Sequence, residues 1–290
     1  MSSLRLDYPE CLRREFPAEF ELAWRASEES VAATAGRNFA ALERHSPSLK
    51  GFDWAGYLRL SAARMVRALR LLRGRVEPGA RVVDFGSYFG NFSLMAAAAG
   101  YRTVAFDSWA EYGECLAPVR DLMASRGIEI VDSEGVDRLP ATLGGADAIL
   151  LMGVIEHIPH TPRLLLEGLR GLLSPGGLLV IDTPNLAYLY KRQALARGET
   201  VFTPIQSQYW TEIPFEGHHR EYTAAEVEWM LGAAGYDVVE KDTFNYSLFG
   251  LAEISGRDLE NYRAMQADPL LREILFYGAV PRPVPAGGRP

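Results

Sequence analysis

Two glycines and two aspartates near the middle of the chain have types and spacing that suit the binding of a polar ligand. Val82 to Ser93 has the sequence VVDFGSYFGNFS, in which Gly86 and Gly90 are four residues apart. Glycine allows a tight turn and a close approach of the backbone to a ligand. Asp107 follows Gly86 by about 20 residues, a position from which a carboxylate accepts both hydroxyls of a ribose. The pattern therefore indicates a ligand that contains a nucleoside.

The elements that must position this loop alternate between short apolar strands and helical segments from Arg81 onward. The predicted strands are 81–85, 102–106, 128–131, 147–152, 177–182 and 236–241, with a last strand near 244–250. The predicted helices between them are 90–99, 111–125, about 136–142, 161–173 and 223–234. Such alternation is typical of a doubly wound α/β fold with a parallel sheet, whose ligands bind beyond the carboxyl ends of the strands.

The chain is predicted to have three parts. They are an N-terminal helical cap over 1–76, a ligand-binding domain over 77–250, and a C-terminal helical segment with a flexible tail over 251–290. Within the cap, 20–42 and 54–72 have helical composition or spacing. Within the domain, 185–222 interrupts the alternation with prolines and aromatic side chains. A long interruption of this kind predicts a substrate lid, in which the aromatic residues form either a pocket wall or a small core of their own.

Composition limits the classes of partner. The 290 residues carry a net charge of −7, which disfavours nucleic acid. No run of about 18 apolar residues occurs, so no membrane partner is predicted. The two cysteines, Cys11 and Cys115, have neither metal-site nor paired spacing, which suits a reducing, cytoplasmic location.

The residues of the loop allow three interpretations. A nicotinamide dinucleotide needs three glycines in the pattern G-x-G-x-x-G, whereas this loop has two. Asp84, two residues before the first glycine, is unfavourable beside a pyrophosphate but suits a cationic ligand such as S-adenosylmethionine, which carries an ammonium and a sulfonium. A glycine turn with a purely structural role is the third interpretation. The carboxylate makes S-adenosylmethionine the favoured ligand.

Residues 78–245 resemble the class I S-adenosylmethionine-dependent methyltransferases, in particular the branch similar to ubiquinone-biosynthesis O-methyltransferases. The first family motif matches Val82 to Gly90, except that Tyr88 replaces the middle glycine. The later matches are DAILLMGVIEHI over 147–158, SPGG and VIDTPN within 174–185, and HHREYT over 218–223. The resemblance implies a Rossmann-like sheet of seven mostly parallel strands, with the helical cap before it and the insert after its fifth strand.

The loop chemistry and the resemblance together predict a cofactor site. The ribose would bind Asp107, and adenine would contact the residues just after the third strand, among them Ser133. The predicted cofactor-binding residues are Asp84, Gly86, Ser87, Gly90, Asp107, Ser108, Asp132, Glu134, Met152 and Gly153. The middle glycine of the family lies under the methionine part of the cofactor, so Tyr88 must point away or reshape the pocket.

Three histidines are candidate catalytic residues, because imidazole titrates in the range required of a general base. His157 follows the fourth strand and would either act on the acceptor or fix its own loop. His218 and His219 are adjacent in an extended stretch, so their side chains should diverge and at most one should face the pocket. Some relatives in the ubiquinone branch resemble Glu-x-x-Glu-His metal sites. Here Gly153 stands at the first glutamate, so no metal is predicted.

The predicted function is the S-adenosylmethionine-dependent methylation of a hydroxyl on a secondary metabolite, a quinone-like phenol or a sugar, in a biosynthetic role. Methylation of an amine is the chemical alternative. A module that binds the cofactor without catalysis, which Tyr88 motivates, and an enzyme that modifies RNA or protein are the other hypotheses. The expected partner is a small-molecule acceptor, and a homodimer is the oligomer considered.

Overall fold

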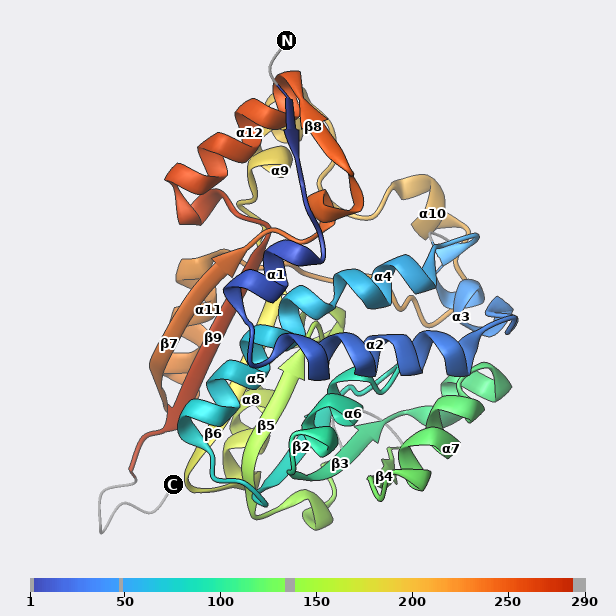
Figure 1. The fold of residues 1–290 in the computed structure, drawn as a ribbon, viewed down its shortest axis with the longest axis vertical. Coiled ribbons are helices and arrows are strands. Elements are labelled where there is room, and N and C mark those ends of the chain that lie inside the picture. Colours follow the sequence, from blue (N-terminus) through green and yellow to red (C-terminus); the bar gives the residue numbers. More distant parts are fainter. Residues whose placement is uncertain (1–2, 47–48, 134–138, 284–290) are drawn as a thin grey trace.

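The computed structural model describes residues 3–46, 49–133 and 139–283. Its centre is a seven-stranded sheet in the order β4-β3-β2-β5-β6-β9-β7 (Figure 1). The strands are β2 (Arg81–Phe85), β3 (Arg102–Asp107), β4 (Glu129–Asp132), β5 (Ala146–Met152), β6 (Leu173–Pro184), β7 (Tyr236–Phe244) and β9 (Ile274–Pro281). Neighbours from β4 to β6 are parallel, whereas β9 is antiparallel to both β6 and β7. The predicted mostly parallel, doubly wound sheet is confirmed.

The last strand of the sheet differs from the sequence prediction. The prediction near 244–250 is wrong, because β7 ends at Phe244 and is followed by the 3-10 helix η5 (Ser247–Gly250). The seventh strand is β9, which the sequence places in a helical segment and tail. It lies between β6 and β7, and residues 274–279 are buried. A strand covered on both faces is a continuous apolar run without alternation, which local periodicity does not distinguish from a buried helix.

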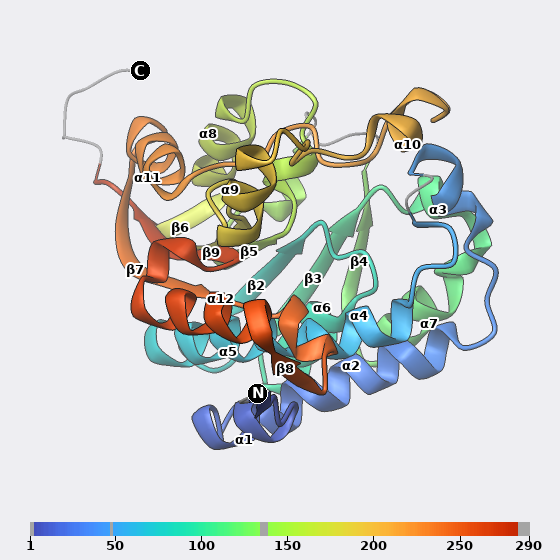
Figure 2. The same ribbon diagram turned by 90° about the horizontal axis from the view of Figure 1, so that it is seen from above.

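Helices cover both faces of the sheet because successive strand residues point to opposite sides. Val82 packs in a cluster with α2 (Phe20–Thr34), α5 (Ala62–Arg75), α6 (Asn91–Ala98) and α7 (Ala117–Ser125). Its neighbour Val83 packs in a second cluster with α8 (Arg163–Leu172) and α11 (Ala224–Ala233). Figure 2 shows these two helical layers on opposite sides of the strands. The loops that follow the carboxyl ends of the parallel strands lie between the two layers, at one end of the strands.

The predicted helices of the cap are present but interrupted. The segment 20–42 contains α2 and the start of α3 (Ala40–His45), and the chain turns between them at Gly36, with φ +72°. The segment 54–72 contains α4 (Trp54–Leu60) and most of α5, separated by Ser61. A short helix, α1 (Glu10–Glu15), precedes them. No helix among the described residues is both long and apolar enough to cross a bilayer.

Two other predicted helices are shorter than expected. Residues 111–125 comprise most of the 3-10 helix η2 (Trp109–Cys115) and all of α7. Of the predicted helix at about 136–142, residues 136–138 lie outside the described residues, and the rest enters the 3-10 helix η3 (Ala141–Leu143). The glycine loop and the end of β3 are still positioned as the sequence predicts, because neither change alters the strand order.

A third, smaller cluster lies at one end of the molecule (Figure 1). It combines β1 (Ser3–Arg5), β8 (Glu253–Ser255), α9 (Leu189–Ala196) and α12 (Gly256–Ala267). β1 and β8 pair antiparallel, which ties the beginning of the chain to a segment after β7. The insert 185–222 is not wholly irregular, since it contains α9 and α10 (Ile205–Tyr209). The 3-10 helix η6 (Pro269–Leu271) leads from this cluster into β9.

A buried ion pair joins the helical cap to the sheet. Arg64 on α5 donates to Asp182 near the end of β6 through two hydrogen bonds, Nε to Oδ2 at 2.7 Å and Nη2 to Oδ1 at 2.5 Å. The side chains are 8% and 0% exposed, so both charges are removed from water. Burial of a charge is unfavourable unless a partner and hydrogen bonds compensate, and here the bidentate geometry supplies both.

Loss of this pair should destabilise the protein strongly. We expect Arg64→Gln to lower the free energy of unfolding by about 3–5 kcal/mol, because it leaves Asp182 buried without its counter-charge. The matched control is Arg59→Gln, which removes the half-exposed pair with Glu28 and should cost about 1 kcal/mol or less. Urea unfolding at neutral pH measures both values. Equal losses in the two variants would show that the buried pair does not hold the cap.

Candidate active site

The loop between β2 and α6 requires both of its glycines. Gly86 has φ +77°, and a Cβ added there would lie 2.5 Å from the Val154 side chain. Gly90 has φ +68°, and a Cβ there would lie 2.7 Å from Met123 Sδ. The backbone N–H groups of Gly86 and Ser87 both donate to the carbonyl of Phe106, which fixes the loop to the end of β3. The amino end of α6 begins directly after Gly90 and faces this loop.

Tyr88 has a left-handed backbone conformation, which favours glycine. Its φ is +44°, and it is the one non-glycine residue with positive φ within the described ranges 3–46, 49–133 and 139–283. The ring centroid lies 4.6 Å from that of Phe89, 5.1 Å from Tyr112 and 5.9 Å from Trp54. The side chain therefore packs into an aromatic cluster under α4. Whether the ring points away from the cofactor or reshapes its pocket stays a prediction.

The carboxylate of Asp107 is held by protein donors at the carboxyl end of β3. Its Oδ1 accepts from the Ser108 backbone at 2.7 Å and from the Tyr112 hydroxyl at 2.6 Å. Its Oδ2 accepts from the Tyr88 backbone at 2.6 Å. Burial raises the pKa of Asp107, and these three hydrogen bonds oppose the rise. A carboxylate has about four acceptor positions, so Oδ2 retains one for a ribose hydroxyl and a movement of Tyr112 would free another.

Asp84 lies beneath the loop. Its carboxylate is 1% exposed and accepts from Ser93 Oγ at 2.6 Å, so the contact that the structure shows joins β2 to α6. Burial raises the pKa of Asp84 to about 7. A nearby cation would favour the ionised form. The carboxyl group that the sequence assigned to cation binding therefore lies inside the protein below the loop.

The other predicted cofactor residues lie around the same sheet edge. Asp132 at the end of β4 accepts from the Trp109 backbone at 3.0 Å. Ser133 follows it and donates its backbone N–H to the carbonyl of Asp107. Met152 ends β5 and is 7% exposed. Glu134 lies outside the described residues.

Gly153 lies against the buried ion pair. It has φ +67°, and a Cβ there would lie 2.6 Å from Arg64 Nη2. Its backbone N–H donates to the carbonyl of Asp182 at 3.2 Å. Any side chain at this position would displace the guanidinium. The glycine thus lets the cap helix α5 reach the end of β5, a requirement that the sequence alone did not show.

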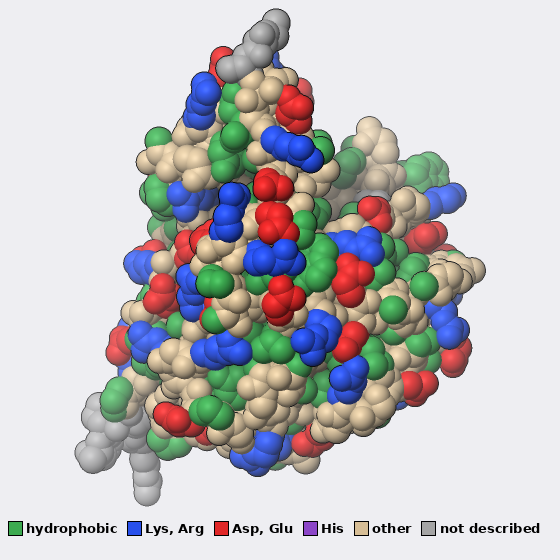
Figure 3. All heavy atoms as spheres, in the orientation of Figure 1, with side chains coloured by type: hydrophobic (Ala, Val, Ile, Leu, Met, Phe, Trp, Pro, Cys, Tyr) green, Lys and Arg blue, Asp and Glu red, His purple; other side chains and the backbone are tan. Residues whose placement is uncertain are grey.

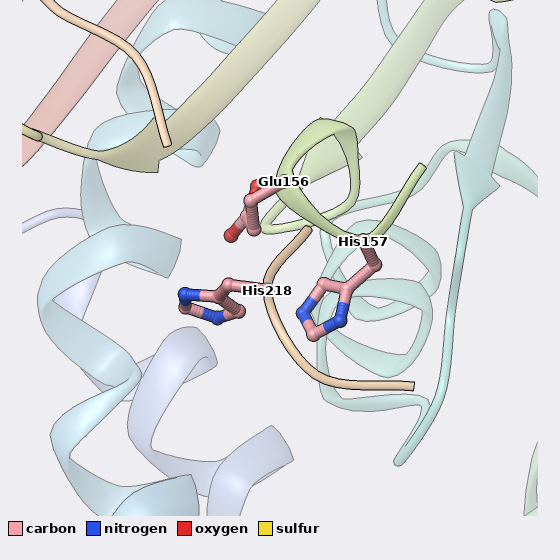
Figure 4. A group of neighbouring side chains, drawn as sticks. All are labelled: Glu156, His157 and His218. Carbon is pink, nitrogen blue, oxygen red and sulfur yellow. The ribbon is translucent and has the colours of Figure 1, made fainter. Parts of the chain in front are cut away.

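A cluster of Glu156, His157 and His218 lies beside this edge (Figure 4). Glu156 and His157 belong to the 3-10 helix η4 (Ile155–His157), and His218 comes from the extended end of the insert. The backbone N–H groups of His219 and Arg220 donate to the Glu156 carbonyl at 2.8 and 3.3 Å, which holds the insert against η4. One candidate ligand atom from each member of the cluster lies within 4.8 Å of those of the other two.

Oxygen atoms orient the rings of this cluster. His157 Nδ1 lies 2.9 Å from the Glu216 carbonyl, and His218 Nδ1 lies 2.9 Å from Glu221 Oε1. Glu221 also forms an ion pair with Lys191 of α9. Burial lowers the pKa of His218 to about 3 and that of Lys191 to about 8.

Glu156 is the buried acid of the cluster. Glu156 is 2% exposed, and this burial raises the pKa of its carboxyl group. Thr183 Oγ1 donates to Glu156 Oε2 at 3.0 Å. The carboxylate is therefore kept in place from the end of β6, on the strand that also carries Asp182.

The remaining histidines lie apart from the cluster. His219 is exposed, and its Nε2 lies 3.0 Å from the Phe215 carbonyl. His218 and His219 therefore diverge as the sequence predicts. His160 is exposed, also as predicted, and His45 Nδ1 lies 3.5 Å from the Glu212 carbonyl.

Several residues that shape the site are not among those predicted from the sequence. They are Arg64, Tyr112, Asp182, Thr183, Lys191 and Glu221. Asp182, Thr183 and Glu221 fall inside the segments that resemble family motifs, which was a usable signal. Arg64 and Lys191 had no such signal, because they meet the site only through packing of distant elements. Tyr112 lies close to Asp107 in the sequence but outside the segments that resemble family motifs.

The strand order, with one antiparallel strand near the edge and a glycine loop after β2, defines a Rossmann-like class I methyltransferase fold. The chain belongs to the methyltransferase domain family, whose model matches residues 57–241. It is a methyltransferase that uses S-adenosylmethionine. A comparison with curated proteins finds no match.

Solved structures support the fold. An S-adenosylmethionine-dependent methyltransferase from Mesorhizobium loti is 18% identical, with a TM-score of 0.53, and the match covers 76% of this chain and 99% of that one. Another such enzyme, from Clostridium acetobutylicum ATCC 824, is 12% identical, with a TM-score of 0.52 and coverage of 76% and 91%. At these identities the similarity concerns the fold alone.

The ribose assignment can be tested at Asp107. We expect Asp107→Asn to weaken both S-adenosylmethionine and S-adenosylhomocysteine by roughly 10- to 100-fold, because both contain the same ribose and each lost charged hydrogen bond is worth about 1.5–3 kcal/mol. Isothermal titration calorimetry gives both Kd values. The control is Asp147→Asn at the amino end of β5, the opposite end of the strands from Asp107, where the carboxylate accepts from the Arg81 backbone N–H. Unchanged affinity in Asp107→Asn would refute the assignment.

The conformation of Tyr88 can be tested with two substitutions. Tyr88→Ala and Tyr88→Gly both remove the ring, but only glycine relieves the left-handed backbone. We expect the glycine variant to be more stable than the alanine variant by about 1 kcal/mol. Thermal or urea unfolding provides the comparison. A more stable alanine variant would mean that residue 88 is not left-handed in solution.

Proposed function

We propose that the enzyme methylates a hydroxyl of a small molecule, within the branch similar to ubiquinone-biosynthesis O-methyltransferases. The observation that carries the proposal is the cluster of Glu156, His157 and His218 beside the predicted cofactor site. A hydroxyl becomes a good nucleophile when its proton is removed, whereas a neutral amine attacks through a free lone pair. An acid–base cluster at this place therefore favours transfer to oxygen over transfer to nitrogen.

The loop fits the cofactor through the chemistry of its donors and acceptors. Asp107 offers an acceptor position to the ribose, and the amino end of α6 supplies N–H groups. When bound, S-adenosylmethionine supplies an electrophilic methyl group. Gly153 and the end of β5 would face the reacting centre, and the Glu156–His157–His218 cluster would receive the acceptor hydroxyl and assist its deprotonation. In this assignment His157 and His218 act on the acceptor, and His219 does not.

The insert 185–222 is proposed as the lid over the acceptor. Two of its seven aromatic residues, Tyr188 and Tyr190, pack in the third, smaller cluster, and Tyr222 is buried against α11. Three others, Phe202, Tyr209 and Trp210, are exposed, at 56%, 72% and 79%. Both outcomes that the sequence left open are thus supported in part. The exposed rings are available to contact an apolar acceptor such as a phenol.

The surface charge supports a small-molecule acceptor over nucleic acid. Figure 3 shows Lys and Arg side chains interspersed with Asp and Glu on the described surface that carries the N-terminal helices. A nucleic-acid interface needs a continuous basic region. The net charge of −7 agrees with this argument.

We also propose that 1–76 acts as a cap, since Trp54 of α4 packs against Tyr88 and α5 supplies Arg64.

Methyl transfer to a panel of phenols, sugars, amines and RNA tests the proposal. We expect product only from hydroxyl acceptors, and a fall in kcat of roughly 100-fold or more in His218→Ala with the Kd for S-adenosylmethionine unchanged. The comparison variant is His219→Ala, whose ring lies outside the cluster. Loss of activity in His219→Ala but not in His218→Ala would refute the cluster assignment. Product from amines alone would favour N-methylation.

A further inference from the structure

We propose that Glu156, His157 and His218 bind a divalent transition-metal ion that in turn binds the acceptor oxygen. The inference rests on the proposed function only for the identity of that oxygen. The sequence predicts no metal, because Gly153 occupies the position of a first glutamate ligand. In the structure the third ligand comes instead from the far end of the insert, where backbone pairing holds His218 beside η4.

The hydrogen bonds of the two histidines fix their tautomers. The Glu216 carbonyl can only accept, so His157 Nδ1 must carry the proton that it donates. The Glu221 carboxylate, which forms an ion pair with Lys191, is the acceptor beside His218 Nδ1, so this nitrogen also donates. The Nε2 atoms of both rings then carry free lone pairs. Histidines that bind metals through one nitrogen generally donate the other N–H to a carbonyl or carboxylate, as these two do.

Glu156 supplies the negative charge of the ligand set. It is buried, and Thr183 donates to one of its oxygens. Among residues 3–46, 49–133 and 139–283, no Lys or Arg side chain forms an ion pair with it, since Arg64 is paired with Asp182 and Lys191 with Glu221. A buried carboxylate is unfavourable unless a cation or donors compensate. A bound dication would provide that compensation, and Figure 4 shows the carboxylate and the two rings gathered around one space.

The ligand types select the metal. Two imidazoles and one carboxylate suit Zn²⁺, Fe²⁺ or Co²⁺, whereas Mg²⁺ and Ca²⁺ prefer oxygen ligands. Three protein ligands are typical of catalytic sites, which leave a position open for substrate, whereas structural zinc sites have four. His157 is exposed, so the open side of the cluster is accessible.

The bound ion would promote the transfer as a Lewis acid. A hydroxyl that binds a dication loses its proton at lower pH, and here the proton would pass to water. The acceptor oxygen then forms a bond to the methyl carbon, the bond from that carbon to sulfur breaks, and its electron pair remains on sulfur. The products are the methyl ether and S-adenosylhomocysteine, with no oxidation or reduction.

Metal binding can be measured without any acceptor. The protein of residues 1–290 is dialysed against EDTA and then titrated with ZnCl₂ by calorimetry and with CoCl₂ by visible absorption, which reports on the ligands directly. We expect one ion per chain and no comparable binding of MgCl₂. His157→Ala and His218→Ala should each weaken binding by roughly 100-fold or more. His160→Ala is the control, because its ring is exposed and lies near the carbonyl of the neighbouring Thr161.

Folding of each variant is checked by circular dichroism and by the Kd for S-adenosylhomocysteine. Failure of the wild type to bind Zn²⁺ or Co²⁺ stoichiometrically, or equal binding by His218→Ala, would overturn the metal site. Methylation of phenols by the metal-free protein would also overturn it while leaving the proposed O-methylation intact. Stoichiometric binding without transfer to any hydroxyl would leave the metal site standing and refute the proposed function.

Discussion

The Arg64–Asp182 ion pair is the contact on which the arrangement of the site depends. It is buried, bidentate and formed between a cap helix and the end of a central strand. Because each charge is removed from water, neither residue can be displaced without a large penalty. Gly153 must be a glycine to leave room for the guanidinium. Through this contact α5 is attached near the glycine loop after β2, and the end of β6 that carries Thr183 is fixed as well.

The insert depends on the same sheet edge for its position. Asn185 bonds the carbonyls of Leu270 and Arg272, and it pairs with Tyr222 where the insert returns. The extended segment before Tyr222, which contains His218, then lies along η4. His218 therefore occupies a defined place although the helix α10 within the insert is largely exposed. In the proposed role as a lid, an insert with an anchored base and an exposed tip would admit an acceptor and still present a fixed side chain to it.

The cofactor loop combines rigidity with one movable contact. Its glycines, the left-handed Tyr88 and the Asp107 carboxylate constrain one another through backbone hydrogen bonds. Tyr112 is the exception, because its hydroxyl reaches Asp107 from η2, where Gly113 interrupts the helix. A side-chain donor can exchange for a ribose hydroxyl, whereas the backbone donors cannot leave without unfolding the loop. The loop is thus preorganised except at the position where the ribose would bind.

The sequence by itself determined the local features of this protein. Glycine spacing fixed the turn after β2, and apolar periodicity located six of the seven strands and most helices, because these depend on neighbouring residues. Only the tertiary structure decided which distant segments meet: β9 between β6 and β7, Arg64 against Asp182, and His218 beside Glu156. Such contacts follow from the packing of whole elements, and no local pattern encodes them. For the same reason the conformation of Tyr88 was open in the sequence and became defined only when Asp107 and the cap helices enclosed it.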